Sequence, residues 1–169
     1  SVGLTQRLNS VCDPEKVGHL LEAVYGYSEP IAISMWESID HALLAGHVAE
    51  ARSAKRVREC LCSLSFLSPE SRRLVYEHLN TDRVAEILRG DLDLKEVFEC
   101  MHFISLEDAS VAKHVCDHIG VSHLSSLLET EEDWDFRTRV ESLERVAGIS
   151  PTTFSELFDI LDLATLAAE

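Results

Sequence analysis

Two histidines, His114 and His118, lie four residues apart in a segment whose apolar residues have helical spacing. On a helix this spacing places both imidazoles on one face, where they could present two nitrogen ligands to a metal ion. Candidate third ligands are His123, Asp117 and the segment 100–102. The pattern His-Val-Cys-Asp-His lacks the second-position glutamate that serves as general base in His-Glu-x-x-His enzymes. We therefore expect two surface imidazoles and no cofactor. The alternative is a metal-dependent or other helical enzyme that uses these histidines with nearby carboxylates.

Other catalytic patterns are missing from the sequence. It contains no Glu-x-x-His motif of the di-iron bundles, no glycine-rich phosphate loop and no Gly-x-Ser-x-Gly elbow. Cys60 and Cys62 lack the two-residue spacer of redox pairs, and on a helix their thiols point in nearly opposite directions. We expect a protein that is not an enzyme.

The cysteines indicate a reducing compartment. They are odd in number and sit in apolar segments, unlike the dense, even sets of secreted disulfide scaffolds; they are Cys12, Cys60, Cys62, Cys100 and Cys116. We expect reduced, mostly buried thiols. No apolar run is long enough for a membrane span, and the sequence contains no charged start followed by an apolar block, as a signal peptide would. The start at Ser1, without a methionine, suggests an excised or processed piece that could lack targeting information. These features predict an intracellular protein, cytoplasmic or nuclear, with no membrane partner.

Charge is distributed unevenly along the 169 residues. The net charge of -15 divides into -5 for residues 1–50, +3 for residues 51–90 and -13 for residues 91–169. The overall sign disfavours nucleic acid as a partner. The separation of the two signs favours protein partners, including a second copy bound head to tail.

The positive part of the chain centres on a basic stripe. On a helical wheel Arg52, Lys55 and Arg56 lie opposite the apolar residues of the same helix, among them Val57 and Leu61. Such a stripe has two interpretations. It is a solvated face that pairs with the protein's own acidic residues, or it is a docking patch that binds an acidic peptide or the acidic end of another copy. The residues that we assign to it are Arg52, Lys55, Arg56, Arg58, Arg72 and Arg73.

The acidic segment surrounds a tryptophan. Trp134 follows Glu131, Glu132 and Asp133 and falls opposite the apolar stripe expected for its helix. Four carboxylates there could simply stabilise a helix N-terminus, but a tryptophan among acids is also a plausible anchor for a basic partner. Trp36, by contrast, lies within its helix's apolar stripe and is expected in the core.

Helix signals dominate the chain, and strand signals are nearly absent. Starts are predicted at Asp13, Ser28, Ser68, Ser105 and Ser150, and Gly46, Gly90 and Gly120 are predicted to end helices. Further helices are expected up to about residue 64, at 82–89, at 93–102, from 122, and from 130 to 147. We therefore expect an all-α protein of about eleven or twelve helices.

Two organisations fit this series. The starts near Ser28, Ser68, Ser105 and Ser150 recur every 37 to 45 residues, a period typical of a short α-solenoid of the HEAT or armadillo type. The other organisation is a compact multi-helix bundle. We treat residues 1–169 as one domain, with a possible subdivision into 1–50, a six-helix core at 51–130, and acidic helices at 131–169.

Residues 54–129 carry a resemblance to a known family. The stretch from Asp93 to Leu128, with Val97-Phe98-Glu99, Phe103-Ile104-Ser105, Ile119-Gly120 and Leu127-Leu128, resembles the last three helices of death effector domains. The resemblance implies a six-helix death-fold bundle and a signalling adaptor. That family usually carries Arg-x-Asp-Leu in its last helix, where this chain has Val121-Ser122-His123-Leu124, so the charged contact of that motif is not implied. Both organisations predict a non-catalytic adaptor or scaffold.

Overall fold

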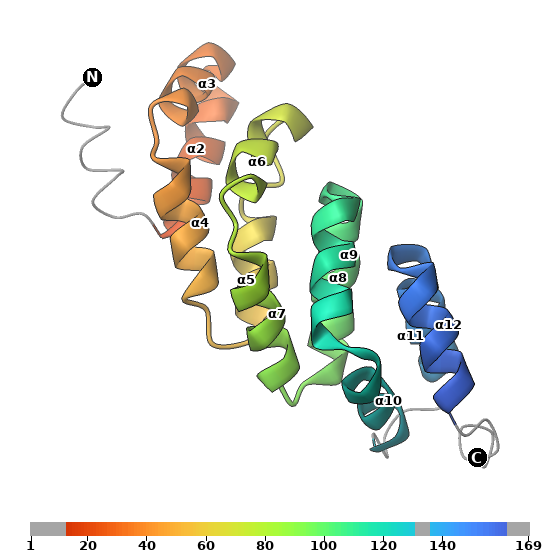
Figure 1. Ribbon diagram of the computed structural model, residues 1–169. Helices are drawn as coiled ribbons and strands as arrows, with labels where there is room; N and C mark the ends of the chain where they lie inside the picture. The colour runs from red at the N-terminus through yellow and green to blue at the C-terminus, as the bar shows by residue number, and fades with distance from the viewer. Residues whose placement is uncertain (1–12, 131–135, 162–169) are drawn as a thin grey trace. The chain divides into compact units, whose positions relative to one another are not determined.

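The computed structural model describes residues 13–130 and 136–161, and these residues form eleven helices and no strand. The all-α expectation is confirmed. The helices, labelled in Figure 1, are α2 (Pro14–Tyr27), α3 (Glu29–Glu37), α4 (His41–Ala49), α5 (Ala54–Cys62), α6 (Pro69–Tyr76), α7 (Thr81–Gly90), α8 (Leu94–Glu107), α9 (Ala109–Ile119), α10 (Val121–Thr130), α11 (Phe136–Ile149) and α12 (Pro151–Ile160). None of the helices in these ranges has the length and apolar character that crossing a membrane requires.

The chain divides into two compact units, residues 1–80 and residues 81–169. The boundary lies inside the segment 51–130. In the first unit α2 packs on α3 and α5, and α4 packs on α5 and α6. In the second unit α9 lies against both α7 and α8, and α11 contacts α8, α9 and α12 (Figure 1).

Short polar side chains set most of the helix starts. Asp13, Ser68 and Ser150 each accept a hydrogen bond from a backbone N–H of the first turn, and a proline follows each of them. Gly120 ends α9 with φ 87°, a left-handed conformation that glycine adopts without steric cost. The helix starts predicted at Asp13, Ser68 and Ser150 and the helix end predicted at Gly120 are therefore confirmed.

Two predicted boundaries are wrong. The single helix expected from Ser28 to Gly46 is broken at Ser38, and α4 starts behind Asp40, whose carboxylate accepts from Leu43 N at 3.1 Å. Gly46 therefore lies inside α4. Ser105 starts no helix either. It lies within α8, where its hydroxyl donates to the carbonyl of His102, and Asp108 caps α9 instead.

The core of the first unit forms around Trp36, which is 1% exposed, as expected. Its indole N–H donates to Ser71 O at 3.1 Å and so joins α3 to α6. The other members of this core are Val17, Leu21, Ile39, Leu44, Ala45, Leu64, Leu67 and Val75.

The second unit has its own core on the inner faces of α7 to α12. Its largest fully buried side chains are Phe98, Leu88, Met101, Ile104, Ile119, Leu124, Leu128 and Leu157. The sequence predicts an apolar stripe of Phe136, Val140, Leu143 and Ala147 on α11. Leu143 is buried as expected, but Val140 and Ala147 are only half-buried, whereas Arg139, Ser142 and Val146 are buried.

Candidate functional site

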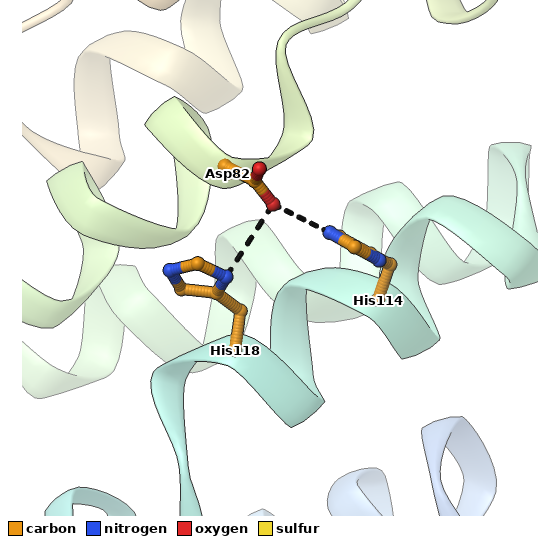
Figure 2. A group of neighbouring side chains, drawn as sticks. All are labelled: Asp82, His114 and His118. Carbon is orange, nitrogen blue, oxygen red and sulfur yellow. Dashed lines mark hydrogen bonds and ion pairs between the residues drawn. The ribbon is translucent and has the colours of Figure 1, made fainter.

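A carboxylate and two imidazoles meet where α7 packs on α9 (Figure 2). Asp82 Oδ1 lies 2.7 Å from His114 Nε2 and 3.4 Å from His118 Nδ1. The two rings are 6.2 Å apart between centroids and come from successive turns of α9, which confirms that the spacing places them on one face. All three side chains are exposed, and their nearest ligand atoms lie within 4.8 Å of one another.

The hydrogen bond from His114 lowers the pKa of Asp82, and the nearby charges of His114 and His118 add to the effect. The Asp82 carboxylate also lies in the first turn of α7, where the helix dipole favours a negative charge. The group is therefore held ionised and ready to accept hydrogen bonds or to bind a cation.

The third ligands considered from the sequence lie elsewhere in the second unit. Asp117 pairs with Lys113 and accepts hydrogen bonds from Ser150 and Thr153 at the start of α12. His123 is half-buried, and burial lowers its pKa. None of these groups, nor the segment 100–102, joins the two histidines in a cluster among the described residues. Asp82 joins them instead, and sequence reasoning missed it because it lies 32 residues before His114.

The residues of the basic stripe lie in the first unit, on α5, just before it, and on α6. The apolar face of α5 is buried as expected, with Ala54, Val57, Cys60 and Leu61 pointing inward. Arg52, just before the helix, and Lys55, in its first turn, are exposed and make no ion pair with any described residue.

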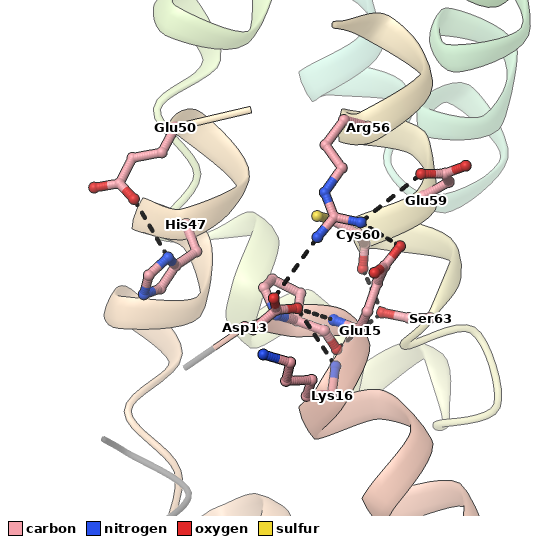
Figure 3. A network of polar contacts seen from close by, with 10 residues as sticks. Asp13, Glu15, Lys16, His47, Glu50, Arg56, Glu59, Cys60 and Ser63 are labelled. Carbon is pink, nitrogen blue, oxygen red and sulfur yellow. Dashed lines mark hydrogen bonds and ion pairs between the residues drawn. The ribbon is translucent and has the colours of Figure 1, made fainter. Parts of the chain in front are cut away.

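Arg56 has a different environment from its two neighbours (Figure 3). Its guanidinium pairs with Glu15 and lies 3.7 Å from Asp13 and 3.8 Å from Glu59. The hydrogen bond with Glu15 is the largest cause that raises the pKa of Arg56. Arg56 thus ties α5 to the start of α2, and its charge is largely balanced by the protein's own acids.

The remaining basic residues also have local contacts. The Arg72 guanidinium donates to Ser65 O at 2.6 Å and to Leu67 O, where it closes the turn before α6. Arg73 Nε lies 2.9 Å from Oε1 of Glu77, the C-cap of α6. Arg58 is half-buried. Of the six predicted cations, Arg52, Lys55 and Arg73 are exposed, and of these three only Arg73 has an ion pair among the described residues.

An open pocket of about 340 Å³ lies beside Arg52. Its lining is mixed in charge, because it includes Arg52 and Arg56 as well as Asp13 and Glu50. His47 on its rim pairs with Glu50 at 3.3 Å. A ligand at this position would meet both signs of charge.

The acidic segment lies outside the described residues. Glu131, Glu132, Asp133 and Trp134, as well as Asp135, belong to the range 131–135, which the structure leaves undescribed. Glu129, just before it, is exposed, and its carboxylate accepts a hydrogen bond of 3.2 Å from Ser125.

The described cysteines are free thiols. Cys60, Cys100 and Cys116 are buried, as expected, while Cys62 is half-buried and Cys12 lies outside the described residues. Burial raises the pKa of Cys60 to about 11 and that of Cys116 to about 12. Both thiols therefore stay protonated near neutral pH and are poor nucleophiles and poor metal ligands.

Comparison of the chain with protein-family models, with curated proteins and with solved structures finds no match.

Proposed function

We propose that this chain is a non-catalytic, intracellular protein–protein interaction module, an adaptor or scaffold, whose exposed cations at the start of α5 bind an acidic segment of a partner. The observation that carries the proposal is the exposure of Arg52 and Lys55 without ion pairs among the described residues, on a chain of net charge -15. A positive surface on an otherwise negative protein selects its partner by charge and speeds the encounter.

The contacts of the other arginines narrow the docking surface. A cation that already pairs with the chain's own carboxylates, as Arg56 does with Glu15, gains little by exchanging one carboxylate for another. Arg72 would have to release two carbonyl oxygens before it could reach a partner. We therefore propose Arg52 and Lys55 as the binding residues, and not Arg56, Arg72 or Arg73, which already contact groups of the chain itself.

A second contact is proposed for the acidic end. The sequence 131–134 surrounds Trp134 with carboxylates and suits a basic partner, since tryptophan is common among the residues that dominate interface energies. Opposite charges on two parts of one chain also allow self-association head to tail. Both the death-effector-like bundle and the helical repeat suggested by the sequence belong to this class of interaction protein.

Affinity capture with matched charge variants tests the proposal. The wild-type chain, the double variant Arg52→Glu/Lys55→Glu and the control Arg89→Glu/Lys95→Glu are immobilised, and the captured proteins are quantified by mass spectrometry. The control reverses two exposed cations in the second unit and changes the net charge equally.

We expect the wild type and the control to capture acidic proteins that Arg52→Glu/Lys55→Glu fails to capture. Capture that is equal for all three folded proteins would contradict it.

A further inference from the structure

We propose that Asp82, His114 and His118 bind one divalent transition-metal ion of the zinc class, which links α7 to α9. This site is independent of the docking surface on α5, because it lies wholly within the second unit. It rests on the convergence of two imidazole nitrogens and one carboxylate oxygen from two packed helices (Figure 2).

The three groups match the ligands that zinc prefers. Two histidines and one carboxylate are a common zinc set, with ligand bonds of about 2.0 to 2.2 Å. Magnesium and calcium prefer oxygen ligands throughout, so a site with two imidazoles selects against them. The nearest cysteine in sequence, Cys116, is buried and does not join the exposed cluster of ligand atoms.

The three ligand atoms lie within 4.8 Å of one another, so a shared ion requires only side-chain adjustment. Tetrahedral bonds of this length place neighbouring ligand atoms about 3.4 Å apart. Asp82 Oδ1 and His118 Nδ1 already lie 3.4 Å apart. His114 Nε2, at 2.7 Å from the same oxygen, would move outward by a fraction of an ångström, which an exposed side chain can do by a small rotation.

The tautomers of the two histidines can change so that a metal ion replaces the contacts to Asp82. Neutral imidazole carries one N–H, and in the metal-free protein that proton can lie between each ring and Asp82. For metal binding, the lone pairs of His114 Nε2 and His118 Nδ1 must face the ion, so the ring protons move to His114 Nδ1 and His118 Nε2. The hydrogen bond between His114 and Asp82 and the longer His118–Asp82 contact are then replaced by three metal–ligand bonds.

The charges around the ligands are largely balanced. His118 lies in the last turn of α9, where the helix dipole presents its negative end, and Asp82 lies in the first turn of α7, where the dipole presents its positive end. The neighbouring cations are already balanced, since Lys113 pairs with Asp117 and Arg83 pairs with Glu86. Solvent exposes 54% of the His114 side chain, 39% of His118 and 62% of Asp82, which leaves room for water to complete the coordination.

Binding of zinc by the untagged, chelator-treated chain tests the site. Isothermal titration calorimetry with ZnCl₂ measures affinity and stoichiometry, and Co²⁺ as a spectroscopic substitute reports the ligand geometry. We expect one ion per chain and visible Co²⁺ bands of a four- or five-coordinate site. Each of His114→Ala, His118→Ala and Asp82→Asn should lower the affinity at least about ten-fold, because even the loss of a residue that only supports a ligand costs that much.

The matched control is His19→Ala, which removes a histidine that is 78% exposed on α2 in the other unit. This control should keep wild-type affinity, and circular dichroism verifies the fold of every variant. Unchanged affinity in Asp82→Asn would mean that the two histidines act alone as an adventitious pair, and it would overturn the proposal. Zinc binding by the triple variant His114→Ala/His118→Ala/Asp82→Asn, or no zinc binding by the wild type, would overturn it as well.

Discussion

Asp117 on α9 accepts a hydrogen bond of 2.8 Å from the hydroxyl of Ser150, the residue that caps α12. Thr153 donates to the same carboxylate oxygen at 2.6 Å. Partial burial alone would raise the pKa of Asp117, but hydrogen bonds from Lys113, Thr153 and Ser150 outweigh it and lower the pKa. One carboxylate therefore fixes the start of α12 against α9.

Replacing Ser150 with alanine should destabilise the protein more than replacing an exposed cap. Ser150 is fully buried, and its loss removes both the helix cap and a hydrogen bond to Asp117, so we expect about 1–3 kcal/mol. The control Ser68→Ala removes the exposed cap of α6 and should cost about 0.5–1 kcal/mol. Urea unfolding compares the two variants. Equal losses would mean that the contact with Asp117 contributes nothing.

Gly18 should not tolerate a side chain. A Cβ at this position would lie 2.3 Å from the backbone oxygen of Ser63, where α2 crosses the end of α5. We expect Gly18→Ala to cost about 1–3 kcal/mol, because the clash is with backbone. Gly26→Ala on the same helix meets nothing within 4 Å and should raise stability by up to about 1 kcal/mol. Thermal unfolding measures both, and a neutral Gly18→Ala would show that the crossing of α2 and α5 is looser than the structure has it.

His41 should make the protein less stable at mildly acidic pH. Its ring packs against Trp36 with centroids 4.6 Å apart, and burial is the main cause that lowers its pKa below the ordinary 6.5. The charge of His78 lowers it further, while a backbone hydrogen bond at Trp36 and the charge of Asp40 oppose the shift. As the pH falls through 6.5, the unfolded chain takes up the proton first, so the free energy of unfolding decreases.

The variant His41→Gln tests this pH dependence because glutamine does not titrate. As the pH is lowered from above 6.5 toward 5, the free energy of unfolding of the wild type should fall more than that of His41→Gln. His19→Gln, at an exposed position, is the control. Parallel losses of stability in the wild type and His41→Gln would rule out His41 as the source.

Helix starts could be predicted where a cap residue and a proline coincide. Asp13, Ser68 and Ser150 all have a proline as the next residue. The start at Asp40 has no such signal, and the apolar periodicity runs across it from α3 into α4. At Ser105 and Asp108 the sequence offers two candidate caps three residues apart, and only the packing of α8 decides between them.

The candidate sites were predictable only in part. Helical spacing places His114 and His118 together, but Asp82 joins them only through the packing of α7 on α9. The exposure of Lys55 follows from the helical wheel of α5, while Arg52 lies just before that helix. The ion pairs of Arg56 with Glu15 and Asp13 arise from tertiary contact, which periodicity does not reveal.

Trp134 provides a separate test of the acidic end. If the proposed contact with a basic partner is correct, Trp134→Ala should weaken partner binding at least about ten-fold, as loss of a dominant interface tryptophan does, while the free energy of unfolding changes little. Binding is measured by surface plasmon resonance with the captured partner, and stability is measured by urea unfolding. A large loss of stability with unchanged binding would assign Trp134 to the core instead.

Direct titration of an acidic peptide tests the central claim, that Arg52 and Lys55 bind an acidic segment. A fluorescein-labelled peptide with the sequence of residues 128–137 represents the acidic end of a second copy, and its anisotropy is followed against the wild type, Arg52→Glu/Lys55→Glu and the control Arg89→Glu/Lys95→Glu. The account predicts saturable binding to the wild type and the control that weakens with added salt, and at least about ten-fold weaker binding to Arg52→Glu/Lys55→Glu. Equal affinity for all three proteins, or no binding to the wild type, would contradict it.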